Sequence, residues 1–384
     1  MLEASQFVET ARALGFDFYA GVPCSFLTPF INYVIDDQAL TYVSAANEGD
    51  AVAAVAGAYL GGRRGVAMMQ NSGLGNAVSP LTSLTHIFRI PMLLICTHRG
   101  APGVQDEPQH ALMGEITEQM FDTMRIPWEI FPRRVEDVAP ALARAVAHME
   151  AHHTPYAFIM HKGTVAPHAL KNQTLPQARP APEVTGHLFN FEQPASLTRE
   201  VALRCLVEQV PEKGTVVLAT TGFAGRELYA VADRPNHLYM VGSMGCISSL
   251  GLGLAMNRPD LQVYVLDGDG AALMRMGNLA TVGTYGGGNL HHILLDNGAH
   301  DSTGAQSTVS ANVDFAGVAR ACGYTEVARG EDAAALANFL VGSSQGPRFL
   351  HLRIRTGARD DLPRPRITPP EVLSRLREHC GPKP

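Results

Sequence analysis

Residues 266–306 read LDGDGAALMRMGNLATVGTYGGGNLHHILLDNGAHDSTGAQ, and they decide the fold of the chain. Two apolar, strand-like runs end in polar residues, the first just before Asp269 and the second just before Asn297. Between them, residues 271–285 are compatible with a helix, and a glycine run follows as a turn. The 28 residues from Asp269 to Asn297 therefore fit one βαβ unit, which needs about 30 residues and brings both strand ends to one edge of a parallel sheet. Asp269 and Asn297 can meet there at one ion.

The two side chains suit a hard cation that is shared with phosphate oxygens. Carboxylate and amide oxygens are ligands of Mg²⁺ and Ca²⁺. Gly268 and Gly270 let the backbone approach a phosphate closely, and the N-terminus of the next helix offers it free N–H groups. A DxDG calcium loop is excluded, because no acidic ligands follow at EF-hand spacing and the flanks are strands.

Composition limits the remaining possibilities. A chain of 384 residues can form two α/β domains, each with its own core. The net charge of −6 and the charged fraction of 17% give no basic surface for nucleic acid or an anionic membrane. The six cysteines lie apart without CxxC pairs, which favours a reduced, cytoplasmic protein. The N-terminus does not read as a cleavable leader, and no apolar run reaches the length of a membrane span.

The order of predicted elements indicates two α/β domains. Strand-like and helix-like segments alternate through residues 1–165 and again through 196–384, with a terminal helix at 369–380. Residues 166–195 are rich in proline and polar residues and lack a period, so they are predicted to be a linker. We expect the α/β class, with two doubly wound parallel-sheet domains. A nicotinamide dehydrogenase is disfavoured, because no GxGxxG follows the first strand.

The pattern GDG, a gap of under thirty residues and a final Asn resembles the signature of enzymes that use thiamine diphosphate (ThDP). The resemblance implies that Mg²⁺ is bound by the side chains of Asp269 and Asn297 and by the backbone carbonyl of Ala299. It also implies the ThDP-binding fold, with residues 1–165 as the pyrimidine-binding domain and residues 196–384 as the diphosphate-binding domain. Family members form homodimers or higher homo-oligomers whose sites lie between subunits, and the same is expected here.

The same resemblance assigns the catalytic carboxylate and the cofactor contacts. Glu48 lies between a strand and a helix of small residues, where the family places the glutamate that hydrogen-bonds N1′ of the cofactor's pyrimidine. An isolated Glu there can instead match the charge of the helix N-terminus. Met244 corresponds to the apolar wedge that bends the cofactor, although a Met is also ordinary core filler. The other predicted cofactor contacts are Thr220, Thr221, Gly222, Gly242, Ser243, Gly268, Gly270 and Ala271.

Three blocks, residues 21–25, 98–110 and 297–308, resemble the family of phosphonopyruvate and sulfopyruvate decarboxylases. The resemblance implies a carboxy-lyase that converts 3-phosphonopyruvate to phosphonoacetaldehyde and CO₂ in phosphonate and antibiotic biosynthesis. Sulfopyruvate decarboxylation and another ThDP-dependent decarboxylation or carboligation stay open as alternatives. A regulatory homologue is disfavoured, because Glu48 and the metal ligands are present.

The expected substrate, a small anionic 2-oxo acid, must be held by hydrogen-bond donors at fixed positions in its pocket, because the chain as a whole has no excess of basic residues to attract it. Arg99 and Arg226 could equally be solvated surface charges, and His110 could be a satisfied loop histidine. Cys246 stands where many family members carry His, and its role stays open. The candidate substrate residues are Ser25, Asn71, Ser72, Arg99, His110, Arg226 and His300.

Overall fold

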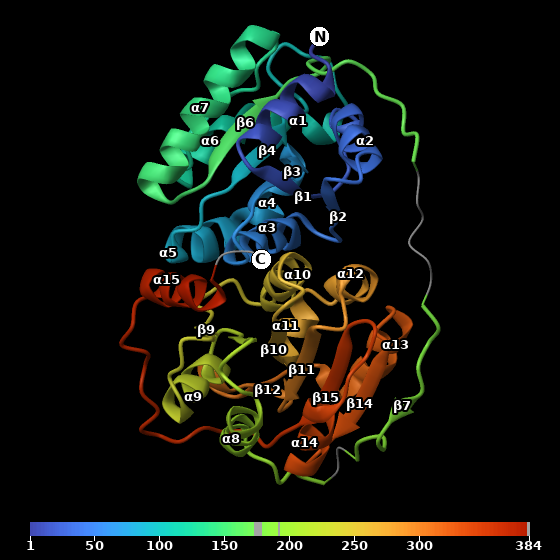
Figure 1. The fold of residues 1–384 in the computed structure, drawn as a ribbon, viewed down its shortest axis with the longest axis vertical. Helices are drawn as coiled ribbons and strands as arrows, with labels where there is room; N and C mark the ends of the chain where they lie inside the picture. Colours follow the sequence, from blue (N-terminus) through green and yellow to red (C-terminus); the bar gives the residue numbers. More distant parts are fainter. Residues whose placement is uncertain (173–178, 191–192, 382–384) are drawn as a thin grey trace. The chain divides into compact units, whose positions relative to one another are not determined.

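The computed structural model describes residues 1–172, 179–190 and 193–381. The chain divides into two compact units, Met1–Leu175 and Pro176–Pro384, and each is built around one parallel sheet (Figure 1). The predicted fold class, α/β with two parallel-sheet domains, is confirmed. None of the described helices combines the length and the hydropathy that crossing a membrane requires.

The sheet of the first unit has the strand order β2-β1-β3-β4-β6-β5, and every pair in it is parallel. Strands β3, β4 and β6 at its centre are almost continuously apolar, as expected for strands covered on both faces. The strands are β1 (Phe16–Gly21), β2 (Thr41–Ser44), β3 (Arg64–Gln70), β4 (Leu93–Thr97), β5 (Trp128–Ile130) and β6 (Tyr156–Met160).

Helices pack on this sheet through their apolar faces. In α1, the buried residues Ala4, Phe7, Val8 and Ala11 form one face, and Phe7 stacks on Phe131 with the ring centroids 4.5 Å apart. Helix α3 is buried along almost its whole length, since its residues are mostly small and apolar. The helices are α1 (Ala4–Ala13), α2 (Thr28–Asp36), α3 (Glu48–Leu60), α4 (Leu74–Pro80), α5 (His86–Phe88), α6 (Ala111–Thr123) and α7 (Val135–His152).

The second unit has a larger parallel sheet of order β7-β14-β15-β11-β10-β8-β9 and a small antiparallel pair, β12 with β13. Its strands are β7 (Val184–Thr185), β8 (Thr215–Ala219), β9 (His237–Tyr239), β10 (Gln262–Gly268), β11 (Leu290–Asp296), β12 (Ala299–His300), β13 (Gln306–Ser307), β14 (Glu326–Gly330) and β15 (Arg348–Arg353). Its helices are α8 (Arg199–Gln209), α9 (Phe223–Val231), α10 (Ile247–Asn257), α11 (Asp269–Met274), α12 (Asn278–Tyr285), α13 (Phe315–Ala321), α14 (Ala333–Val341) and α15 (Pro369–Cys380).

The two units share one topology. Without β7 and read from its other edge, the second sheet has the order β9-β8-β10-β11-β15-β14, which repeats the order of the first sheet strand for strand. In each unit the chain moves to one side after the first strand and to the other side after the third. Such a switch point leaves a crevice beyond the carboxyl ends of these two strands, where α/β proteins bind ligands. In the second unit the crevice lies beyond β8 and β10.

Two local predictions differ from the structure. Within the predicted linker, Val184 and Thr185 form β7 and pair with Val327 and Ala328 at the edge of the sheet. A strand of two residues is too short to produce a detectable period.

The helix predicted over residues 271–285 is divided into α11 and α12, with residues 275–277 between them. The break falls at Arg275, whose φ of −132° and ψ of 41° are not helical, whereas Gly277 already has helical angles as the residue before α12.

Candidate active site

A cavity lies beyond the carboxyl ends of β8, β10 and β11 in the second unit, at the switch point. We call it the strand-end cavity. It brings together most of the residues predicted to bind the diphosphate and the metal, and residues that the sequence did not indicate. Its lining is formed by Arg199, Thr220, Thr221, Gly222, Phe223, Ala224, Met244, Asp267, Gly268, Asp269, Gly270, Ala271, Leu295, Asn297, Ala299, His300, Asp301 and Ser302.

Asp269 is the first residue of α11, and it is 2% exposed. The Thr308 hydroxyl donates a hydrogen bond to its Oδ2. Burial raises the pKa of Asp269 to about 6, the bond from Thr308 lowers it, and the negative charge of Asp296 raises it. A buried carboxylate in this state is stabilised by a cation, because the positive charge offsets the lost hydration.

Asn297 directly follows β11, and its amide is oriented by a neighbour. Its Nδ2 donates to Oδ2 of Asp301 at 2.7 Å, so the carbonyl oxygen Oδ1 is left as the acceptor, where it receives the backbone N–H of Ala299 at 3.3 Å. Asp301 is itself held by the Arg199 guanidinium at 2.7 Å and by the N–H of Gly357 at 3.0 Å. This arrangement fixes which end of the Asn297 amide can face an ion.

The donor set suits Mg²⁺ bound together with a phosphate. Among the described residues, no group of three His, Cys, Asp or Glu side chains could hold a metal. The predicted set differs from such a cluster, since it joins one carboxylate, one amide and one carbonyl, and the phosphate supplies the remaining oxygens.

The walls of the cavity also suit a diphosphate. The Thr220 hydroxyl is buried and has no hydrogen-bond partner within the described ranges. An unpaired buried hydroxyl costs free energy, and a hydrogen bond to a phosphate oxygen would remove that cost. Gly222 has φ +93° and ψ −146°, a conformation essentially limited to glycine, and it caps the N-terminus of α9. A side chain at Gly270 would lie 2.4 Å from Cε1 of His300, so only glycine allows His300 to pack there.

The loop before α10 has an unusual backbone. Gly242, Ser243 and Gly245 all have positive φ, and for Ser243 the angle is +44°. The N–H of Gly242 donates to the Thr221 hydroxyl at 3.2 Å, which ties this loop to the end of β8. The loop brings Met244 over Gly270, where its Cε lies 3.1 Å from the position of a side chain added there. Strained backbone of this kind occurs at functional sites.

Cys246 is fully buried and directly precedes α10. Its backbone N–H bonds to the carbonyl of Ser243 at 3.0 Å, so the residue helps to close the loop.

Glu48 is the first residue of α3 in the first unit and is 9% exposed. The side chain of Asn47 caps the helix by accepting the N–H of Gly49 at 2.8 Å, so Glu48 is not needed as the cap. Its Oε2 accepts a hydrogen bond from the Asn76 amide at 2.8 Å. A side chain at Gly73 would lie 2.1 Å from Oε1, so this glycine makes room for the carboxylate.

Arg99, a predicted substrate residue, is already paired. It forms a two-pronged ion pair with Asp106, and the bond from Arg99 holds the pKa of that carboxyl well below its usual range. A further N–H of Arg99 donates to the Ser25 hydroxyl at 3.2 Å, and its guanidinium lies 4.7 Å from the centre of the Phe26 ring. Ser25 and Arg99 thus lie side by side, but Asp106 offsets the charge of the arginine.

Two other predicted substrate residues of the first unit, Asn71 and Ser72, have partners within it. The Asn71 amide is fully buried and bonds to the backbone of Arg99 and to Thr117, so it positions Arg99. The hydroxyl of Ser72 accepts a bond from Gln70. His110 is buried, and its Nδ1 has no partner in the part of the chain that the structure describes.

Arg226 lies outside the strand-end cavity. It lines a neighbouring cavity, where its guanidinium donates to the backbone carbonyls of Leu362 and Pro363. The sequence reasoning missed Arg199, Thr308 and Asp301. The only available signal was that Asp301 follows Asn297 by four residues within a polar loop.

Known proteins resemble the chain over nearly all of its length. Residues 3–126 match the N-terminal TPP binding domain of thiamine pyrophosphate enzymes, and residues 221–352 match the C-terminal TPP binding domain. Phosphonopyruvate decarboxylase of Streptomyces viridochromogenes is 45% identical over 98% of this chain and 94% of its own length. Sulfopyruvate decarboxylase subunit beta of Methanothermobacter thermautotrophicus is 38% identical over 42% of this chain and 84% of its own length.

Among solved structures, benzoylformate decarboxylase from Polynucleobacter necessarius superposes with a TM-score of 0.69 at 14% sequence identity, over 92% of this chain and 99% of that one. At this identity the likeness establishes the fold alone.

Proposed function

The chain belongs to the phosphonopyruvate decarboxylase family of thiamine pyrophosphate enzymes, and we propose that it converts 3-phosphonopyruvate to phosphonoacetaldehyde and CO₂ with ThDP and Mg²⁺. That it is a ThDP-dependent decarboxylase follows from the family. The choice of substrate is supported by the relative that is 45% identical and is named for this substrate. The match to the sulfopyruvate decarboxylase subunit is shorter, and a sulfopyruvate decarboxylase that matches 97% of this chain is only 27% identical, so sulfopyruvate is the second candidate.

The strand-end cavity is the observation that carries the cofactor assignment. We assign Mg²⁺ to the carboxylate of Asp269, the Oδ1 of Asn297 and the carbonyl of Ala299. The geometry that supports this assignment is the buried carboxylate and the amide whose nitrogen is already taken by Asp301. The diphosphate is assigned to Thr220, which lacks a partner for its buried hydroxyl, and to the glycines and helix N-termini around it.

Glu48 is assigned to the pyrimidine of the cofactor. Its carboxyl group is held by Asn76 through Oε2 and is suited to share a proton with the ring nitrogen N1′. Gly73 has no side chain that would cover the other oxygen, Oε1. The bound cofactor supplies the electron sink for the loss of CO₂. Met244 and the positive-φ loop around it serve to hold the cofactor in its bent form.

We further propose that the enzyme is a homodimer or higher homo-oligomer with its sites between subunits. Relatives named as the alpha and the beta subunit of sulfopyruvate decarboxylase are consistent with activity that needs more than one chain. We place the enzyme in the cytoplasm, which the six cysteines without a disulfide support, and in phosphonate biosynthesis.

The test is a decarboxylation assay with phosphonopyruvate, sulfopyruvate and pyruvate, each with and without ThDP and Mg²⁺. We expect CO₂ release and phosphonoacetaldehyde from the first substrate, with the highest kcat/KM, only when both cofactors are present. A higher kcat/KM for sulfopyruvate would replace the proposed substrate by the second candidate. Turnover after complete removal of divalent metal would refute the Mg²⁺ assignment.

A further inference from the structure

A second cavity of the second unit, of about 480 Å³, adjoins the strand-end cavity. The two share Thr221, Gly222 and Ser302 in their linings. Its volume lies within the range of small-molecule sites. Two arginines line it, Arg226 from α9 and Arg364 from the segment before α15, and we call it the arginine cavity.

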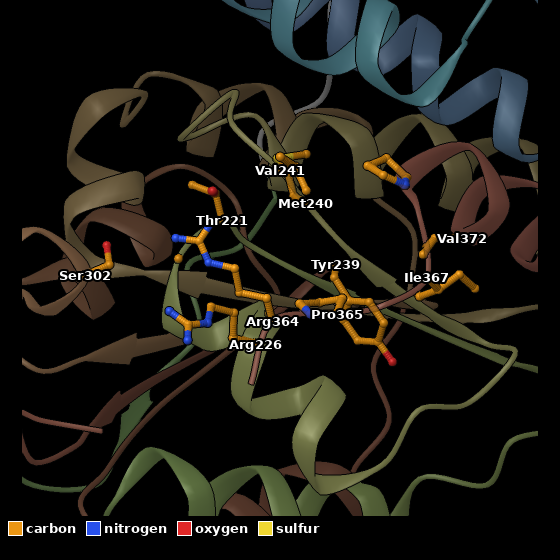
Figure 2. A pocket seen from close by; sticks show the side chains of 13 residues that line it. Thr221, Arg226, Tyr239, Met240, Val241, Ser302, Arg364, Pro365, Ile367 and Val372 are labelled. Atoms are coloured by element: carbon orange, nitrogen blue, oxygen red, sulfur yellow. The ribbon is translucent and has the colours of Figure 1, made fainter. Parts of the chain in front are cut away.

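Neither arginine has a carboxylate partner within residues 1–172, 179–190 and 193–381. Arg226 bonds only to backbone carbonyls, and Arg364 has no hydrogen-bond or ion-pair partner among the described residues. Figure 2 shows the two guanidinium groups next to each other, on the side of the cavity where Thr221 and Ser302 lie. Arg226 is half-buried and Arg364 is exposed. Several buried or half-buried arginines of this unit pair with carboxylates, whereas Arg234 bonds, like Arg226, to a backbone carbonyl. The paired arginines are Arg199, Arg258, Arg329, Arg348, Arg353 and Arg375.

Two adjacent cations without a counter-ion repel each other, and the repulsion is relieved when an anion binds between them. The chain's net charge is −6, so no general positive field explains their placement. An arginine fork is well matched to the oxygens of a phosphonate group, which accept paired N–H donors.

The segment that carries Arg364 is anchored, so its backbone is held beside the cavity. Arg226 binds the carbonyls of Leu362 and Pro363, and the Tyr229 hydroxyl accepts the N–H of Arg366 at 3.3 Å. Prolines on both sides of Arg364 fix two backbone angles in advance. Preorganisation of this kind lowers the entropy that binding costs.

We propose that the arginine cavity is the subsite for the phosphonate tail of the substrate, with Arg364 as its principal ligand and Arg226 as its second cation. The proposal rests on the proposed function, since it names the part of the site that holds the 3-phosphonate. Neither arginine lines the strand-end cavity, so the diphosphate of ThDP is held by other groups.

Arg364→Gln is the variant that tests the subsite, because it removes the charge and the guanidinium group while keeping an unbranched, polar side chain. Arg366→Gln is the matched control, since Arg366 lies two residues on, is exposed, and does not line the cavity. We expect Arg364→Gln to raise KM for phosphonopyruvate about 10- to 100-fold, the loss of one charge-assisted contact. KM for pyruvate, which lacks the tail, should stay within about twofold in both variants.

Two binding measurements on the holoenzyme complete the test. By calorimetry, methylphosphonate should bind the wild type and Arg366→Gln alike and Arg364→Gln at least tenfold more weakly, while ThDP affinity in the presence of Mg²⁺ should be equal in all three proteins. A loss of ThDP affinity in Arg364→Gln without a change in the KM ratio would assign the arginines to the cofactor and overturn the proposal. Equal methylphosphonate binding by both variants would overturn it as well.

The same measurements separate the subsite from the proposed function. If the wild type decarboxylates phosphonopyruvate and Arg364→Gln has the same KM for it, the subsite is refuted and the proposed function stands. If the wild type binds methylphosphonate through Arg364 but does not decarboxylate phosphonopyruvate, the proposed function is refuted and the anion site is supported.

Discussion

Replacing Gly73 by Ala is a sharp test of the role assigned to Glu48. The added Cβ would lie 2.1 Å from Oε1 of Glu48, 2.3 Å from its Cδ and 2.6 Å from its Cγ. Cβ atoms do not approach other atoms within about 3 Å, so the two groups must separate by about 1 Å. The carboxylate is the end of a flexible side chain, and we expect it to move rather than the backbone.

The displacement affects turnover more than folding. Moving the Glu48 carboxylate breaks the 2.8 Å hydrogen bond that it accepts from Asn76. The carboxylate is then also misaligned with N1′ of the cofactor, the nitrogen that it is proposed to contact. A misplacement of about 1 Å can lower a rate about 100-fold, equivalent to about 2.7 kcal/mol of activation free energy. We therefore expect kcat of Gly73→Ala to fall about 100-fold, with a melting temperature within a few degrees of the wild type.

Gly75→Ala is the control, because it lies two residues further along, within α4, and a side chain there meets no atom within 4 Å. An alanine inside a helix should stabilise the protein by about 0.5–1 kcal/mol relative to glycine and leave kcat unchanged. The assay is steady-state decarboxylation at saturating ThDP and Mg²⁺, with melting followed by circular dichroism. Wild-type kcat in Gly73→Ala would refute the reasoning, and equal losses in both variants would show that the turn itself, rather than its contact with Glu48, matters.

Four further outcomes are expected. Asp269→Ala or Asn297→Ala should lose Mg²⁺-dependent ThDP binding in calorimetry, because each removes a ligand of the ion. Wild-type affinity for ThDP in either variant would refute the metal assignment. Glu48→Gln should bind ThDP normally but lose nearly all turnover, mainly in kcat, and a wild-type rate of proton exchange at C2 of the bound cofactor would exclude Glu48 as the activator. Mixing the inactive Glu48→Gln and Asp269→Ala proteins should restore part of the activity if each site is shared by two chains, whereas no recovery after proven subunit exchange would place the site within one chain. Asp301→Ala should weaken Mg²⁺ binding about 10- to 100-fold, because the Asn297 amide is then no longer held in one orientation. The control is Glu227→Gln, which alters the other carboxylate bound to Arg199 and should leave Mg²⁺ binding unchanged. Equal losses of Mg²⁺ affinity in both variants would show that Asp301 has only a structural role.

Local pattern predicted the secondary structure well. The alternation of apolar runs and helical periods predicted the two parallel sheets but missed the short strand β7, and the terminal helix begins and ends where the sequence predicted. The family and the decarboxylase class, which rested on resemblance, are confirmed by the relatives. The roles assigned to individual residues stay predictions, although the strand-end cavity brings Asp269, Asn297 and Ala299 into one lining.

The sequence by itself determined the two parallel sheets and the placement of Asp269 and Asn297 at one cavity, because strand periodicity and the length of a βαβ unit are properties of a local stretch of chain. Tertiary structure alone decided that Asp301 takes the nitrogen of the Asn297 amide and that Asp106 offsets the charge of Arg99. It alone brought Arg364 beside Arg226, across more than a hundred residues of chain. Such contacts depend on how packed elements bring distant side chains together and on which buried charges find a partner, and neither leaves a periodic trace in the sequence.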